Sequence, residues 1–462
     1  MIGGIFVNRN VYKLFCVILI IMFTVSMTAC GNESKAVTPS ASDSAGTTVQ
    51  NTTEPSTEGT SAVQEEKVKL KIFSQYSLPE EKQPFDYAKE QVAKVMPNVE
   101  LDLDIEPQDD NAKLKTLAAS GSLPDIIRVT AGVVDLFKKS NNLLLLDDYV
   151  KELKIEDRIR PAYKGLLWDS DNHCYAVPRT ASPTYIMYYN KELFTQNNIK
   201  VPTNYDEFLA SIKAFNSKGV MPVSLFAKEA WPGVMLFDAF ATRYDAGGLM
   251  KVVNDRKGRI TEDAYKKAAT QVLECVKAGM LSKSAFTTDY DTAFNQFTSG
   301  KCAYFFNGAW ALGPIGDKLG DKVDYLDFPL ADTATVEASK YNRPGGGFDG
   351  GYSVSANTQY KDIAAKYACL FALETANGRV IKASEAYPLT TDDVQPEKPY
   401  PAIALKYAEE SKNYKSTTRF PWGLNEKGNV ILGENVAKLL TGSYPVDKFI
   451  EDTDKALEDA LK

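Results

Sequence analysis

The sequence has very little of the chemistry on which most hydrolases and metalloproteins depend. Histidine occurs once in 462 residues, as His173, and neither a G-x-S-x-G elbow nor an H-E-x-x-H helix is present. No C-x-x-C pair occurs, which argues against a zinc or iron–sulfur site. We therefore expect no metal, no cofactor and no enzymatic activity. A glycosidase needs only two carboxylates, however, and with 60 acidic residues that alternative stays open.

Blocks of basic residues are also missing. The chain has 53 Lys and Arg against 60 Asp and Glu, and its first 29 residues hold two basic and no acidic side chains. Without those residues the net charge is −9. Such acidity argues against nucleic acid or an anionic lipid surface as the partner.

The N-terminus carries an export signal. Two basic residues precede an apolar run from Leu14 to Met27, which is shorter than the roughly 20 residues needed to cross a bilayer. Small residues then lead to Cys30, and the segment 27–31 resembles a bacterial lipobox, in which this cysteine becomes the lipidated N-terminus. We expect residues 1–29 to be a lipoprotein signal peptide and Cys30 to hold the protein at the extracellular face of the cell membrane. An ordinary cleaved signal peptide is the alternative.

Residues 30–66 differ from the rest of the chain. Small, polar and acidic side chains dominate them, and residues 32–66 include no aromatic side chain. Such a segment cannot bury enough apolar area to offset the entropy lost on ordering. It is predicted to be a disordered linker. The roughly 395 residues that follow are more than a single hydrophobic core usually supports, so we expect two lobes.

Two periodicities alternate from residue 67 to 130. Val68, Leu70 and Ile72 alternate with lysines as a strand, and two further strands near 99–105 and 126–129 are separated from it by helical patterns. This order predicts parallel βαβ units in an α/β fold, whose ligands lie beyond the carboxyl ends of the strands. The candidates there include Gln75 and Tyr76. Later in the chain, a helical pattern that begins near residue 361 is expected to end near Gly378.

Several motifs, in order, resemble extracellular solute-binding proteins of family 1, the sugar-binding components of ABC importers. They are Ser120-Gly121 with Pro124-Asp125, the segments 175–178 and 188–208, the block 297–310 with Asn307 and Trp310, and Gly350-Gly351-Tyr352. The resemblance implies a two-lobe periplasmic-binding-protein-like fold (type II), in which each lobe is a sheet flanked by helices and hinge strands join the lobes. The first lobe would hold residues 67–177 and 331–384, and the second lobe residues 178–330 and 385–462. The crossings are expected near residues 176–178, 325–329 and 384–389.

Candidate ligand contacts follow from the needs of a sugar. A pyranose offers C–H faces and hydroxyls, so its site needs flat aromatic rings and planar polar groups. Trp231, Trp310 and Trp422 each lie among helix breakers, and Asp349 lies within a glycine-rich run. The alternatives are packing tryptophans, a turn-forming aspartate, and strand caps at Gln75 and Tyr76.

The sequence thus predicts a lipid-anchored receptor. It would capture a carbohydrate, with an oligosaccharide as the first candidate, by closing its lobes, and would deliver it to the permease subunits of an ABC transporter. We expect a monomer that touches the membrane through its lipid anchor only. A surface carbohydrate sensor or adhesin and an extracellular glycoside hydrolase are the alternatives.

Overall fold

The computed structural model describes residues 67–462 except 170, 327–329, 415 and 418–424. The predicted signal peptide, the predicted linker, Cys30 and Trp422 lie outside the described residues. Within the described part, no helix combines the length and the apolar character that crossing a membrane requires.

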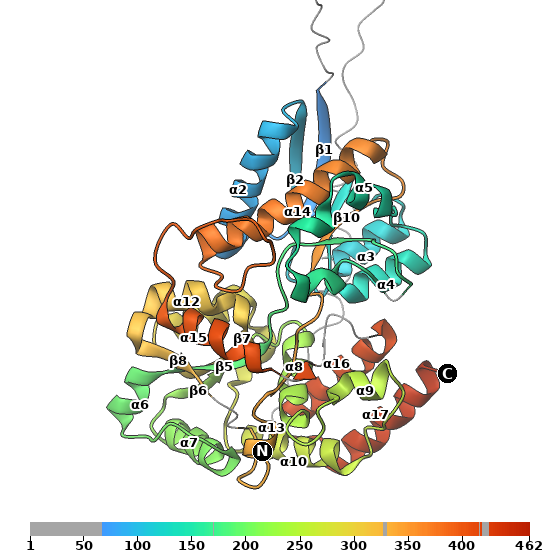
Figure 1. Ribbon diagram of the computed structural model, residues 1–462. Coiled ribbons are helices and arrows are strands. Elements are labelled where there is room, and N and C mark those ends of the chain that lie inside the picture. The colour runs from blue at the N-terminus through green and yellow to red at the C-terminus, as the bar shows by residue number, and fades with distance from the viewer. Residues whose placement is uncertain (1–66, 170, 327–329, 415, 418–424) are drawn as a thin grey trace, which may run out of the picture. The chain divides into compact units, whose positions relative to one another are not determined.

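The first lobe is built on a five-stranded sheet in the order β2-β1-β3-β10-β4 (Figure 1). The strands are β1 (Val68–Ser74), β2 (Val99–Ile105), β3 (Ile126–Val129), β4 (Val177–Pro178) and β10 (Gly351–Val354). As predicted, β1 pairs parallel with β2 and β3, while β10 is antiparallel to β3 and β4. The helices are α2 (Pro79–Val95), α3 (Ala112–Ala119), α4 (Ala131–Lys139), α5 (Asp147–Glu152), α14 (Lys361–Ala383) and the 3₁₀ turns η1 (Ile155–Arg158) and η2 (Pro161–Leu166).

The second lobe is built on a four-stranded sheet in the order β6-β7-β5-β8. Its strands are β5 (Tyr185–Asn190), β6 (Met221–Ser224), β7 (Cys302–Gly308) and β8 (Val323–Tyr325). Its α-helices are α6 (Lys191–Asn197), α7 (Tyr205–Ser217), α8 (Trp231–Ala241), α9 (Gly248–Val253), α10 (Asp263–Lys277), α11 (Tyr290–Thr298), α12 (Leu312–Leu319), α13 (Val336–Ser339), α15 (Ala402–Glu410), α16 (Glu426–Leu440) and α17 (Val446–Ala460). Short elements complete it: η3 (Lys283–Thr287), η4 (Ala309–Ala311), η5 (Gly320–Lys322), η6 (Ser411–Asn413) and the paired strands β9 (Asn342–Arg343) and β11 (Ser416–Thr417).

Helix α14 continues past Gly378, where we expected it to end. It packs against α2 of the same lobe (Figure 1). A Cβ atom on Gly378 would lie 2.9 Å from the Cα atom of Pro84, so glycine here allows close approach of two helices instead of ending one. The cysteines of the described residues are four buried free thiols.

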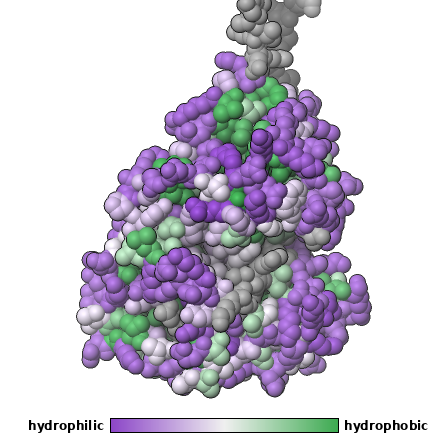
Figure 2. Space-filling view, viewed as in Figure 1, coloured by the Kyte–Doolittle hydropathy of each residue, from purple (hydrophilic) through white to green (hydrophobic). Residues whose placement is uncertain are grey.

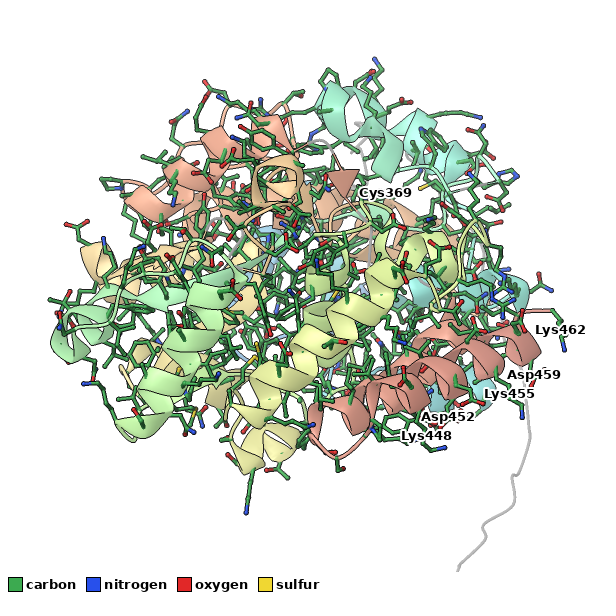
Figure 3. All side chains as sticks on the ribbon, turned by 90° about the horizontal axis from the view of Figure 1, so that it is seen from below. Cys369, Lys448, Asp452, Lys455, Asp459 and Lys462 are labelled. Carbon is green, nitrogen blue, oxygen red and sulfur yellow. The ribbon has the colours of Figure 1, made fainter. Side chains whose placement is uncertain are left out.

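The face shown in Figure 2 is largely hydrophilic, with small hydrophobic patches. Lys448, Asp452, Lys455 and Asp459 lie along one side of α17, and Lys462 follows beyond the end of the helix (Figure 3), whereas Phe449 and Leu457 are buried. This spacing is the ordinary pattern of an amphipathic surface helix.

Two hinge segments run side by side between the lobes. The first connects β4 to β5 and so crosses between Pro178 and Tyr185, after the residues 176–178 that we predicted. The second approaches it where Gly345 forms an antiparallel bridge with Thr184, and a Cβ atom on Gly345 would lie 2.6 Å from the ring of Tyr185. Gly345 has a φ of +88°, which favours glycine. The glycine run therefore belongs to a hinge.

The second crossing lies later in the chain than residues 325–329, of which 327–329 are outside the described part. Residues 331–343, assigned above to the first lobe, pack on the second: the Tyr205 amide donates to the Ala331 carbonyl at 2.8 Å, and Lys267 pairs with Asp332. Hydrophobic spacing could not reveal this, because these contacts join segments far apart in sequence.

The third crossing also differs from the prediction. Residues 385–397, assigned above to the second lobe, stay on the first: Thr390 bridges Ile159, and Asp392 pairs with Arg158. Lys398 then pairs with Asp317 on α12. The chain thus crosses after residue 397 rather than at 384–389.

Candidate functional site

A cavity lies between the two lobes, at the carboxyl ends of β1, β2 and β3. It has an empty volume of about 970 Å³, part of it open to solvent. The first lobe contributes Gln75, Ser77, Glu80, Glu81, Glu106, Pro107, Gln108, Asp110, Asn111, Arg128, Thr130, Arg179, Asp349 and Arg379, and the second lobe contributes Glu229, Trp231, Tyr290 and Trp310.

Aromatic rings form the wall on the second lobe. Trp231 is the first residue of α8, where Pro232 fits the first helical turn, and Trp310 lies in η4 directly after β7. The ring centroids of Trp231 and Trp310 are 6.3 Å apart with planes inclined at 60°, and both rings contact Tyr185 edge-on. Trp231 Nε1 donates to Glu229 Oε2 at 2.7 Å, which fixes its indole. Both tryptophans are partly exposed, so they present ring surface to the cavity.

Buried polar groups form the wall on the first lobe. Arg128 Nη1 donates to Glu106 Oε1 at 3.0 Å, and Arg179 Nη2 donates to Gln75 Oε1 at 3.0 Å. Some buried atoms have no hydrogen-bond partner among the residues that the structure describes: Glu80 Oε1, Glu106 Oε2, Arg128 Nε and Arg179 Nε. Leaving such groups unpaired costs about 1–3 kcal/mol each, so a ligand that both donates and accepts would be stabilised here.

Two arginines of this wall have carboxylate partners and one does not. Arg128 pairs with Glu106, and Arg379 Nε contacts Glu385 at 2.6 Å. Arg179, which is 8% exposed, makes no ion pair within the described part of the chain. Its burial and the nearby cations Arg128 and Arg379 lower the pKa of its guanidinium.

Three glutamate side chains of the cavity have raised pKa values. Burial, with help from Glu81, raises the pKa of Glu80 from 4.5 to about 7. Burial and the nearby Asp110 raise the pKa of Glu229 to about 7 as well. Burial also raises the pKa of Glu106. Glu80 and Glu229 can therefore exchange between hydrogen-bond donor and acceptor near neutral pH.

The candidates from the sequence divide into three groups. Gln75, Trp231, Trp310 and Asp349 line the cavity. Tyr76 and Asn307 are not among the lining residues: the Tyr76 hydroxyl donates to Asp86 at 3.0 Å, and the fully buried Asn307 donates to the hydroxyl of Tyr290 at 3.3 Å. Trp422 lies outside the described residues.

Sequence reasoning missed most of the charged wall. Glu106 directly follows β2, so the strand-end rule could have identified it. Arg128 lies inside β3, Arg379 lies inside α14 and Glu80 lies in the first turn of α2, where nothing in the local pattern separates them from structural residues.

Two α/β lobes, hinge segments and a shared cavity define the periplasmic-binding-protein-like class of fold. The chain belongs to the family of bacterial extracellular solute-binding proteins, whose sequence profile matches residues 77–372.

Individual relatives and solved structures are similar at low identity. The multiple sugar-binding protein of Streptococcus mutans is 23% identical over 271 residues, which is 55% of this chain and 60% of that protein. An uncharacterised ABC transporter extracellular-binding protein of Pyrococcus horikoshii is 24% identical over 56% of this chain and 60% of its own length. The chain thus spans about 60% of these curated relatives. Among solved structures, a chitin oligosaccharide binding protein has a TM-score of 0.72 at 22% identity and covers 85% of this chain and 99% of its own.

A second solved structure agrees with the first. A protein from work on xylan utilization by Caldanaerobius polysaccharolyticus has a TM-score of 0.72 at 23% identity, over 84% of this chain and 99% of that one. Likeness at this identity concerns the fold.

Proposed function

We propose that the protein captures a carbohydrate, with an oligosaccharide as the first candidate, and delivers it to an ABC permease. The main support is that one cavity combines the rings of Trp231 and Trp310 from one lobe with unpaired buried donors and acceptors from the other. A sugar has apolar C–H faces for the rings and hydroxyls that donate and accept. Relatives that are named as sugar-binding proteins favour the same ligand class.

Capture by lobe closure follows from this division of the site. Each lobe alone offers half of the contacts, so a ligand that touches both halves favours the closed form by its differential affinity. We propose Gln75, Arg179 and Asp349 as polar contacts and Trp231 and Trp310 as platforms. Asn307 would act through Tyr290, whose hydroxyl it contacts, and Tyr76 would support the end of β1.

A glycan panel tests the ligand class. At least one neutral oligosaccharide among xylo-, malto-, fructo- and chito-oligosaccharides is expected to produce a saturable change in tryptophan fluorescence, because two indoles line the cavity. No reducing ends should be released. A panel without any saturable change would contradict the proposal, and released reducing ends would instead establish the glycoside hydrolase.

Transport is tested separately from binding. Deletion of the gene is expected to abolish uptake of the bound sugar, measured with radiolabelled ligand. Unchanged uptake in a strain that lacks the protein would favour the surface sensor or adhesin.

We further propose that the mature protein is a monomer held at the extracellular face of the membrane by lipid on Cys30. Cys30→Ser is expected to release the protein into the culture medium, because the linker then carries no acyl chains to partition into the bilayer. Immunoblots of membrane and medium fractions measure this. Cys174→Ser, which changes a buried thiol, is the control and should stay in the membrane fraction. Continued membrane attachment of Cys30→Ser would rule out the anchor.

A further inference from the structure

One loop of the first lobe bonds directly to the second lobe. It comprises residues 106–111, between β2 and α3, and we call it the 106–111 latch. Gln108 Oε1 accepts from the Tyr290 amide at 3.0 Å, and Gln108 Nε2 donates to Asp291 Oδ1 at 3.2 Å. Asp110 Oδ2 accepts from the Ala230 amide at 2.9 Å. Beside it, Lys115 on α3 pairs with Glu426 at the start of α16.

These bonds cap the exposed ends of two helices. The first amides of a helix have no partner within the helix. Ala230 is the N-cap of α8 and offers no side-chain cap, so the Asp110 carboxylate of the other lobe supplies one. In α11 the N-cap side chain of Asp289 accepts a hydrogen bond from the Thr292 amide, and Gln108 Oε1 accepts one from the Tyr290 amide. A negative charge at the N-terminus of α8 is also favoured by the helix dipole.

The capped helices begin at the residues that line the cavity. Trp231 and Tyr290 are the first residues of α8 and α11, respectively. Each latch bond therefore holds a helix end within one residue of a cavity-lining ring. The latch is positioned to set the orientation of that aromatic wall relative to the first lobe.

The latch is shaped by contacts within its own lobe. Asp110 and Asn111 have φ values of +53° and +63°, a left-handed conformation that non-glycine residues rarely adopt. Asp109 Oδ2 accepts from the Lys113 amide at 3.0 Å and so ties the loop to the start of α3. Backbone strain of this kind persists where the surrounding structure holds it, and it is concentrated at functional segments.

We propose that Gln108 and Asp110 are positioning residues that hold the lobes closed before any ligand binds, by capping α8 and α11 across the cleft. In the wild-type protein the unliganded state thus includes a substantial population of the closed form. Ligand binding raises that population further. The consequence for affinity rests on the proposed function, whereas the closure itself does not.

Amide hydrogen exchange of the unliganded, full mature chain tests the closure. The amides of Ala230 and Tyr290 are expected to be protected about tenfold or more in the wild type and to lose this protection in Asp110→Ala and Gln108→Ala, respectively. Asp110→Asn keeps a carbonyl acceptor and should retain part of the Ala230 protection. Gln395→Ala is the matched control, because it removes a glutamine–aspartate bond of 2.9 Å that stays on one lobe. Unprotected Ala230 and Tyr290 amides in the wild type, or protection that survives in Gln108→Ala and Asp110→Ala, would overturn the proposal.

Binding kinetics separate this inference from the proposed function. With the glycan that the panel identifies, Asp110→Ala should dissociate about five- to tenfold faster, because it loses one hydrogen bond of the closed form. Gln108→Ala loses two such bonds and should dissociate at least as fast. The association rate should change much less. A glycan that binds with unchanged kinetics in both variants would refute the latch and leave the function standing. If the Ala230 and Tyr290 amides are protected but no glycan of the panel binds, the proposed function is refuted and the latch stands.

Discussion

Trp231→Ala is expected to weaken glycan binding about 100-fold. Truncation of a buried aromatic contact typically costs 2–4 kcal/mol, and this indole is held in place by Glu229 and the edge-on contact with Tyr185. Its loss removes a flat platform and leaves the Glu229 carboxylate without that donor. Isothermal titration calorimetry with the glycan from the panel measures the effect.

Phenylalanine at the same position separates stacking from hydrogen bonding. Trp231→Phe keeps a ring but loses Nε1, so it should recover most of the affinity lost in Trp231→Ala. Trp168→Phe is the control, because Trp168 packs against the hydrophobic core and is not among the cavity-lining residues. The glycan affinity of this variant should be unchanged. Wild-type affinity in Trp231→Ala would show that this ring is a packing residue.

The free energy of unfolding of the unliganded protein is expected to depend on pH through the titration of Glu80. The unfolded chain ionises this group near pH 4.5, whereas the folded protein keeps it protonated to about pH 7, because burial disfavours the carboxylate. Between these values the folded state binds more protons, so its free energy of unfolding falls as pH rises. Glu80→Gln removes this loss. It should match the wild type near pH 4.5 and exceed it by up to about 3 kcal/mol at pH 8 in urea denaturation.

Glu207→Gln provides a control with the opposite sign. Hydrogen bonds from Lys200 and Thr203 lower the pKa of Glu207 to about 2, so this carboxylate stabilises the fold above its unfolded pKa of 4.5. That contribution is lost as pH falls from 4.5 toward 2. Glu207→Gln should therefore be less stable than wild type at neutral pH and approach it in acid. A stability difference for Glu80→Gln that does not change between pH 4.5 and 8 would contradict the account of Glu80.

Much of the fold could be predicted from local pattern. The alternation of Val68, Leu70 and Ile72 with lysines predicts one buried face, and the structure buries these three side chains and exposes the lysines between them. The order of strands and helices predicted the parallel β1–β3 core, because short connections of this kind restrict the topology. The end of α14 was mispredicted because Gly378 serves helix packing, a role that its neighbours in sequence do not reveal.

The site could be predicted only in part. Tryptophans among helix breakers and an aspartate among glycines stand out locally, and Trp231, Trp310 and Asp349 do line the cavity. Asn307 is buried and contacts the Tyr290 hydroxyl instead of lining the cavity. Alternation along β7 fixes which side chains face inward only after the sheet has paired.

The sequence by itself determined the family, the predicted export signal and the parallel core of the first lobe, because periodicity, composition and ordered motifs are properties of neighbouring residues. Only the tertiary structure decided where the chain crosses between lobes, which arginines and glutamates pair on the first-lobe wall of the cavity, and that Gln108 and Asp110 cap helices of the opposite lobe. The caps depend on contacts between residues more than 100 positions apart in sequence, such as Asp110 with Ala230. The distances that define them exist only after both sheets have formed and the hinge segments have set the lobes against each other.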